Sequence, residues 1–271
     1  SGGAQRSNSI IMEEGRRRGH SISEYNWDSD QLILGHPYDV VISSNLEAIS
    51  RNFPPIINWI SSHPNHVRLE HDANRYLPEE VRKTLFSSCK KTFFLSDFHH
   101  NQFVESYGNY FVNVEIVPDP IDSKIFRDLK EPREEKILYA GFMHPFKGTD
   151  SFFSHVLENP DIEFVVAGWS SNDQYMRNCN AFSNIDMLGK VDYEEMSALY
   201  NRYAKLFYKP VFYEPFCRCV AEALLCGIEI ESNDLIGSLH FFNEVGHDEF
   251  IRQCDKAPET FWEKLECLQL Q

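Results

Sequence analysis

Short apolar runs that alternate with longer amphipathic stretches constrain the fold of this chain most strongly. Apolar runs rich in Val, Ile, Leu and Phe are typical of strands buried on both faces of a sheet. The amphipathic stretches between them predict helices that connect one parallel strand to the next. We therefore expect an α/β fold in which parallel sheets are covered by helices.

The strand and helix pattern occurs twice, which predicts two domains. A turn-rich segment with three prolines and dense charge, residues 117–136, separates the two halves. We expect an N-terminal domain at 1–118, a linker at 119–136 and a C-terminal domain at 137–271. The sequence opens on a glycine turn and a helix, so the strand that precedes the first helix of a doubly wound domain is expected to be missing.

The local patterns give approximate boundaries for these elements. In the first half we expect helices at 7–20 and 77–89, and strands at 21–26, 38–44, 65–71 and 91–96. In the second half we expect strands at 137–142, 162–169, 185–190, 205–211 and 228–233, and helices from about 150, at 192–203, from Pro215 to the residue before Gly227, and at 257–270.

Composition excludes several classes of function. The formal net charge of −15 makes nucleic acid an improbable partner, because affinity for phosphates comes mainly from Lys and Arg. No apolar run approaches the roughly 20 residues that span a bilayer, so we expect no transmembrane segment, although peripheral contact with a membrane stays open. The seven cysteines show no CxxC pair and are expected to be reduced thiols in a cytoplasmic protein.

Two glutamates, Glu214 and Glu222, lie eight positions apart around the expected start of a helix in "EPFCRCVAEALLCG", residues 214–227. A helix that packs in a core has no use for carboxylates there. With Pro215 as the first helical residue, Glu214 lies just outside the helix and Glu222 about two turns inside it. The first backbone N–H groups, from Phe216 through Cys217 and Arg218 to Cys219, together with the positive end of the helix dipole, suit a diphosphate.

Several stretches in this order resemble the retaining glycosyltransferases of family four. They lie at 2–20, 95–108, 114–122, 137–153, 163–169, 188–203 and 214–227, and the last is the most specific. The resemblance implies the GT-B fold, with two Rossmann-like domains facing across a cleft. It also implies transfer of a sugar from a nucleoside-diphosphate sugar to a hydroxyl acceptor, such as a growing glycan, with retention of anomeric configuration.

The resemblance also implies roles for individual residues. Glu222 takes the ribose hydroxyls of the donor, Glu214 lies against hydroxyls of the donor sugar, and Lys147 contacts the donor phosphates. His71 approaches the transferred sugar or the acceptor. Many relatives carry an arginine where this chain has Phe142, so a second cation must come from elsewhere.

Other site residues are inferred from the sequence itself. Arg218 is close enough along the chain to supply the second cation, or it points away from the site. Asp72 shares a loop with His71 and could orient an acceptor hydroxyl. Gly2 and Gly3 lack a Cβ and would let the backbone approach the diphosphate.

We expect no protein-bound metal and no cofactor besides the donor substrate. The Asp-Ser-Asp triplet at 28–30 and the Phe-His-His triplet at 98–100 lack a ligand set at usable spacing. Two other functions stay open on the same fold. One is a non-catalytic protein that binds a nucleotide sugar or a partner, and the other is a nucleotide-sugar epimerase, for which no acid and base set is evident.

Overall fold

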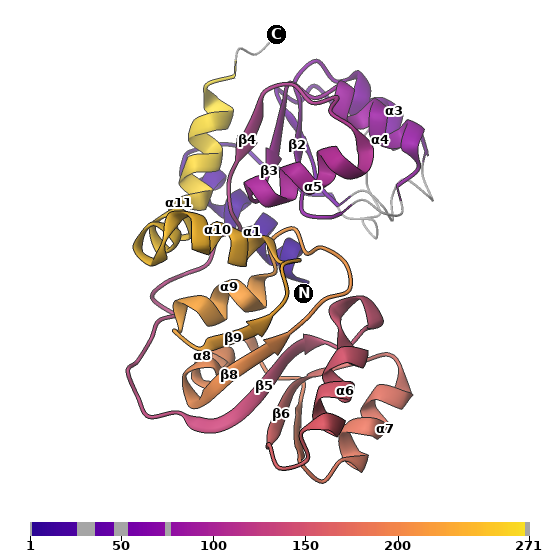
Figure 1. Cartoon of the computed structure of the whole chain (residues 1–271). Coiled ribbons are helices and arrows are strands. Elements are labelled where there is room, and N and C mark those ends of the chain that lie inside the picture. The colour runs from indigo at the N-terminus through magenta and orange to yellow at the C-terminus, as the bar shows by residue number, and fades with distance from the viewer. Residues whose placement is uncertain (1, 26–35, 46–53, 74–76, 269–271) are drawn as a thin grey trace. The chain divides into compact units, whose positions relative to one another are not determined.

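The computed structural model describes residues 2–25, 36–45, 54–73 and 77–268. The chain divides into two compact units, the first made of 1–120 with 256–271 and the second of 121–255. Each unit holds one parallel sheet covered by helices, as Figure 1 shows. The α/β prediction is therefore confirmed.

The first unit is built on a four-stranded parallel sheet in the order β1-β2-β3-β4. Its strands are β1 (Val41–Ser43), β2 (His66–Leu69), β3 (Lys91–Phe94) and β4 (Val114–Ile116). Its helices are α1 (Gly3–Arg17), α3 (Pro54–Ser62), α4 (Glu79–Ser87) and α5 (Asp97–Tyr107). Every residue of β2 and β3 is buried, as expected for central parallel strands. The strand expected at 21–26 is wrong for its described part, because 21–25 are not in a strand.

The second unit is built on a five-stranded parallel sheet in the order β7-β6-β5-β8-β9. Its strands are β5 (Glu134–Phe142), β6 (Phe164–Trp169), β7 (Ile185–Gly189), β8 (Tyr203–Tyr208) and β9 (Glu229–Ser232). Its helices are α6 (Thr149–Glu158), α7 (Asp173–Ala181), α8 (Tyr193–Arg202), α9 (Arg218–Leu225) and α10 (Gly237–Val245), with the 3-10 turn η1 (Pro145–Lys147). Helices α6 and α7 pack on one face of this sheet through a core that includes Phe152 and Phe164.

The last helix differs most from the expected organisation. Helix α11 (His247–Glu266) begins before residue 257 and continues through Pro258. Its residues from Lys256 onward belong to the first unit, so the boundaries differ from a C-terminal domain at 137–271. The physical reason is an apolar face: Phe261 and Trp262 pack against Ile11 and the face of β2 and β3, and the Trp262 indole donates to the Ile11 carbonyl at 2.6 Å.

Candidate functional site

The point where strand order reverses locates the candidate site in the second unit. From β5 the chain builds the sheet outward through β6 and β7 on one side and through β8 and β9 on the other. Ligands of open α/β sheets bind beyond the carboxyl ends of the strands at such a point. The loops that follow β5 and β8, residues 143–148 and 209–217, both emerge there.

A glycine brings these two loops into direct contact. Gly148 has φ +78, and a Cβ at this position would lie 1.8 Å from the Lys209 carbonyl oxygen. The backbone N–H of Val211 donates to the Phe146 carbonyl at 3.1 Å across the same junction. The close approach places Lys147 beside the loop that carries Glu214.

Lys147 and Glu214 form an ion pair at this junction. The Lys147 ammonium lies 2.6 Å from the Glu214 carboxylate, and the two side chains are 38% and 15% exposed. Burial is the largest single influence and lowers the pKa of Lys147, but the Glu214 carboxylate and the neighbouring cysteines together raise this pKa above its usual value. The Tyr208 hydroxyl donates to the same carboxylate at 3.4 Å. The structure therefore brings together two residues that the sequence places 67 positions apart.

The backbone around Glu214 is held by the segment that leads into α10. Glu214 and Ile236 form a parallel β-bridge. The Glu214 N–H donates to the Leu235 carbonyl at 2.7 Å, and the Gly237 N–H donates to the Glu214 carbonyl at 2.9 Å. Because both backbone groups of Glu214 are bonded, its carboxylate is presented from a rigid position.

The predicted helix start at Pro215 is wrong, since α9 begins at Arg218. Cys217 adopts a left-handed conformation with φ 68 and ψ 82, which a helical residue cannot have. Glu222 is consequently about one turn inside the helix, not two. The N–H groups of the first turn are those of Arg218 and Cys219, so the predicted anion cradle begins two residues later than Phe216.

Phe216 is a core residue whose side chain is 1% exposed. It packs against Phe241 and Phe250, and its carbonyl accepts the Ser238 N–H at 2.8 Å. Its side chain anchors the loop before α9. Any contact with a ligand is therefore left to its backbone N–H.

Glu222 and Arg218 face one another along α9. The Glu222 side chain is 6% exposed, and its carboxylate lies 3.5 Å from the Arg218 guanidinium, which is 9% exposed. Arg218 also donates to the Tyr193 hydroxyl of α8 at 3.3 Å. Arg218 thus points along its own helix toward Glu222 and α8, and its role as a second phosphate-binding cation stays a prediction.

An aromatic cluster that the sequence analysis missed lies at the carboxyl ends of β5 and β6. Phe142 contacts Trp169 with ring centroids 4.7 Å apart and stacks on His144 at 6.0 Å. Phe146 continues the cluster beyond His144. Trp169 is 47% exposed and Phe146 38%. The sequence drew attention to Phe142 only because many relatives have an arginine there. Nothing in the sequence indicated that this ring would meet Trp169, which lies at the end of another strand.

In the first unit, His71 follows β2 and is held from two sides. Its Nε2 lies 2.9 Å from the Asn8 side-chain oxygen of α1, and its Nδ1 lies 3.4 Å from an Asp119 carboxylate oxygen. The His71 side chain is only 2% exposed. The sequence identified His71 but missed Asn8 and Asp119, which approach it from distant parts of the chain.

A chain of hydrogen bonds sets the orientation of the Asn8 amide. The Asn8 amide nitrogen donates to the Ser44 hydroxyl at 3.2 Å, which donates to the Asn45 oxygen at 2.7 Å. The Asn45 amide nitrogen then donates to the Asp72 carboxylate. Because a carboxylate only accepts hydrogen bonds, every donor in this series points toward Asp72. The Asn8 amide nitrogen is used by Ser44, so the Asn8 oxygen faces His71. His71 Nε2 therefore carries a proton and donates it to Asn8.

Asp72 is a partly enclosed acid next to a buried ion pair. Burial and then the neighbouring Glu70 carboxylate raise the pKa of Asp72. Glu70 itself is fully buried with Arg68 at 2.7 Å and accepts the Asp72 N–H at 2.9 Å. Asp72 is thus the anchor of the Asn45–Ser44–Asn8 chain, and its contact with an acceptor stays a prediction.

Gly2 and Gly3 open α1, and the structure gives no internal reason for glycine at the first of them. Gly2 has φ −73, which any residue adopts, and a Cβ there would meet only the Gln5 side chain at 3.8 Å. Approach of a ligand to this backbone stays a prediction.

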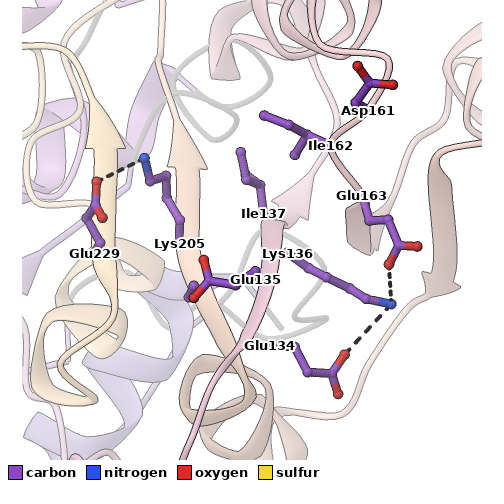
Figure 2. A pocket seen from close by; sticks show the side chains of 10 residues that line it. Glu134, Glu135, Lys136, Ile137, Asp161, Ile162, Glu163, Lys205 and Glu229 are labelled. Carbon is purple, nitrogen blue, oxygen red and sulfur yellow. Dashed lines mark ion pairs between the residues drawn. The ribbon is translucent and has the colours of Figure 1, made fainter.

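A hollow lies at the amino ends of the strands in the second unit's sheet, and the lysines that line it form ion pairs with glutamates of the same lining (Figure 2). It is lined by the amino ends of β5, β8 and β9 and by residues 161–163 before β6. Lys136 pairs with Glu163 at 2.8 Å, and Lys205 pairs with Glu229 at 2.9 Å. Because ligands of such sheets bind at the carboxyl ends, this hollow is not the candidate site.

Within the described residues, no three His, Cys, Asp or Glu side chains are arranged to hold a metal ion, and no helix has the length and apolar character to cross a membrane. The triplet at 28–30 lies outside the described residues. His99 is buried in the first unit, where its Nε2 lies 3.2 Å from the Asp72 carbonyl.

Comparison with known families identifies the chain. The family model for glycosyl transferases group 1 matches residues 121–261, more than half of its length. This chain belongs to the glycosyl transferases group 1 family. The matched region contains Lys147, Glu214, Arg218 and Glu222. No curated protein matches the chain in sequence.

Solved structures show the same fold. AviGT4, a glycosyltransferase involved in avilamycin A biosynthesis, is 16% identical with a TM-score of 0.55, over 98% of this chain and 90% of its own. HepE from Anabaena, in complex with UDP and glucose, is 14% identical with a TM-score of 0.60, over 84% of this chain and 70% of its own. TarM from S. aureus is 14% identical with a TM-score of 0.53, over 76% of this chain, which spans 46% of TarM. The fold is that of the GT-B glycosyltransferases.

Proposed function

We propose that the chain transfers a sugar from a nucleoside-diphosphate sugar to a hydroxyl acceptor, with retention of anomeric configuration. One observation carries the proposal: Lys147, in the loop after β5, meets Glu214, in the loop from β8 to α9, at 2.6 Å beyond the carboxyl ends of both strands. A cation, a carboxylate and a helix N-terminus then converge where this fold binds ligands.

Lys147 and the N-terminus of α9 are assigned to stabilising the leaving diphosphate. In the proposed reaction the bond from the sugar anomeric carbon to the phosphate oxygen breaks as the bond to the acceptor oxygen forms. Negative charge builds on the leaving diphosphate, where Lys147 and the first N–H groups of α9 stabilise it. The acceptor proton passes to that diphosphate on the same face of the sugar, so no enzyme nucleophile is required.

Glu214 and Glu222 are assigned to binding the hydroxyl groups of the donor's sugar and ribose. Glu214, held by its backbone bonds to Leu235 and Gly237, accepts hydrogen bonds from hydroxyls of the transferred sugar. Glu222 accepts bonds from the ribose hydroxyls, which replace part of its contact with Arg218. The solved complexes of HepE and TarM contain UDP, so uridine is the first base to test.

His71 is assigned to positioning and not to proton removal. Its Nε2 donates to Asn8, so this nitrogen is not a base in the resting arrangement. We assign the imidazole to holding the transferred sugar or the acceptor, with Asp72 orienting the acceptor hydroxyl through the same loop.

A binding protein without turnover is the second candidate, and Phe142 favours it. An aromatic ring packed on Trp169 and His144 stands where a phosphate-binding cation is expected, which weakens stabilisation of a leaving group. Release of free diphosphate from a donor separates the two functions, because a binding protein leaves the donor intact.

The test combines ligand binding with turnover. UDP, GDP, dTDP, ADP and CMP are added to the wild type and to Glu222→Ala in a thermal-shift panel with NAD as a control, since a ligand of the folded state raises the midpoint. The matching nucleotide sugars are then incubated with the protein, and released diphosphate and the anomeric configuration of the product are measured by NMR. Stabilisation by one diphosphate that Glu222→Ala loses, followed by retention in the product, supports the proposal. Binding without turnover supports the second candidate, and no binding contradicts both.

A further inference from the structure

Two thiols lie in van der Waals contact at the start of α9. The Cys217 and Cys219 sulfurs are 3.4 Å apart, and both residues are partly exposed. Of the other cysteines, Cys89, Cys179, Cys226 and Cys254 are buried, and Cys267 is exposed. A disulfide bond is about 2.05 Å long, so its formation needs the sulfurs to approach by roughly 1.4 Å.

Cys217 also occupies a position that fits a cysteine poorly. Its φ of 68 lies in the left-handed region, where a Cβ is unfavourable and glycine is the usual residue. The left-handed turn carries the Cys217 sulfur to that of Cys219, the second residue of α9.

We propose that Cys217 and Cys219 form a redox-sensitive dithiol that a hydroperoxide converts reversibly into a disulfide, and that the disulfide weakens nucleoside-diphosphate binding at α9. The first half of this proposal stands on the sulfur geometry alone. The second half rests on the proposed function.

The chemistry balances in two steps. One sulfur attacks the peroxide, the O–O bond breaks, and a sulfenic acid and an alcohol or water result. The second thiol displaces water from the sulfenic acid and the S–S bond forms. Two thiols are oxidised, one peroxide bond is reduced, and a thiol reductant reverses the change.

The order of the two sulfurs follows from their surroundings. The hydrogen bond with Cys217 and burial raise the pKa of Cys219, so Cys219 remains a thiol and acts as the resolving partner. Cys217 lies at the N-cap position of α9 and is partly exposed, so a peroxide can reach its sulfur. The charge of the Lys147 ammonium opposes part of the rise in the pKa of Cys219, so this thiol lies within electrostatic reach of the proposed phosphate contact.

Oxidation would change the part of α9 that faces the diphosphate. We expect that drawing the two sulfurs together rotates the peptide groups of Arg218 and Cys219, whose N–H groups the proposed function assigns to the diphosphate. A backbone N–H group that no longer points at the phosphate loses its hydrogen bond, so we expect the oxidised protein to bind UDP about tenfold more weakly.

The sequence supplies a direct readout of the bond. Trypsin cleaves after Arg218, between the two cysteines, and yields fragments 206–218 and 219–252. A Cys217–Cys219 disulfide holds these fragments together until a reductant is added. Fragment 219–252 also contains Cys226, so Cys226→Ala is the matched control and Cys219→Ser is the test variant.

The experiment treats the full chain with one equivalent of hydrogen peroxide, followed by tryptic mass mapping and UDP titration. We expect linked fragments in the wild type and in Cys226→Ala but not in Cys219→Ser, and a loss of UDP affinity that dithiothreitol restores. The Kd of Cys219→Ser for UDP should be the same before and after treatment with peroxide.

The outcomes separate this inference from the proposed function. Unlinked fragments in the wild type, or linked fragments that persist in Cys219→Ser, overturn the dithiol. Linked fragments with an unchanged UDP affinity overturn the control of binding by oxidation. If fragments link but the reduced protein binds no nucleoside diphosphate, the proposed function fails while the dithiol stands.

Discussion

Replacing Glu214 by Gln is expected to strengthen the binding of UDP while it weakens the use of a UDP-sugar. In the structure Glu214 holds Lys147 at 2.6 Å, so a diphosphate must compete with this carboxylate for the lysine. Glutamine keeps the size of the side chain and removes the charge. It therefore releases Lys147 and removes a like charge from the neighbourhood of the phosphates.

The size of the gain follows from the exposure of the pair. Exposed ion pairs are worth about 0.2–1 kcal/mol, and this pair, with Lys147 38% exposed and Glu214 15%, belongs near the upper end of that range. About 1 kcal/mol corresponds to a roughly fivefold lower Kd. Transfer from the sugar donor should fall at the same time, because Glu214 is assigned to the sugar hydroxyls.

Isothermal titration with UDP and a transfer assay measure the two effects separately. Glu229→Gln is the matched control, since Glu229 pairs with Lys205 at 2.9 Å at the amino ends of the strands and should leave both quantities unchanged. A Glu214→Gln variant that binds UDP several-fold more weakly than the wild type would refute the competition between Glu214 and the diphosphate.

Three further predictions follow from individual contacts. Gly148→Ala places a Cβ 1.8 Å from the Lys209 carbonyl at φ +78 and should lower the free energy of unfolding by at least about 1–2 kcal/mol in urea titrations; a loss below about 0.5 kcal/mol contradicts the close approach. Burial lowers the pKa of His66 to about 3 and of His99 to about 4, so both stay neutral when folded but take up protons when unfolded. Stability should therefore fall as pH drops from about 6.5 to 4, by up to about 1.4 kcal/mol per pH unit for each histidine, and a flat urea midpoint across that range is the contrary result. Phe142→Arg should tighten UDP binding because it places a cation beside the phosphates. Calorimetry that shows equal or weaker binding would argue against phosphates lying next to residue 142.

The sequence selected residues of the second unit that the structure brings together, Lys147 and Glu214, but it did not predict the local backbone geometry around them. Glu214, Glu222 and Lys147 were identified because their neighbours form a specific pattern, and the parallel sheet follows from the apolar runs. The start of α9 was placed three residues too early because nothing in "EPFCRC" indicates that Cys217 is left-handed. Such a conformation depends on the contacts of Phe216 with α10 and α11, which are tertiary.

The first unit shows a different limit of sequence reasoning. His71 and Asp72 could be selected from one loop, but the Asn8–Ser44–Asn45 chain that orients them comes from α1 and the end of β1. No local pattern links those positions. The helix expected at 257–270 was placed too late for a similar reason: α11 begins at His247, and packing of Trp262 on Ile11 determines which unit its last part joins.

Calorimetric titration of UDP, GDP and ADP into the wild type, Lys147→Met and Lys205→Met tests the central claim most directly. Both lysines pair with a glutamate in the second unit, but only Lys147 lies at the carboxyl ends of β5 and β8. We predict that one diphosphate binds, that Lys147→Met weakens it by about tenfold or more, and that Lys205→Met leaves it unchanged. Binding that is absent in the wild type, or equal in all three proteins, would contradict a donor site at this position.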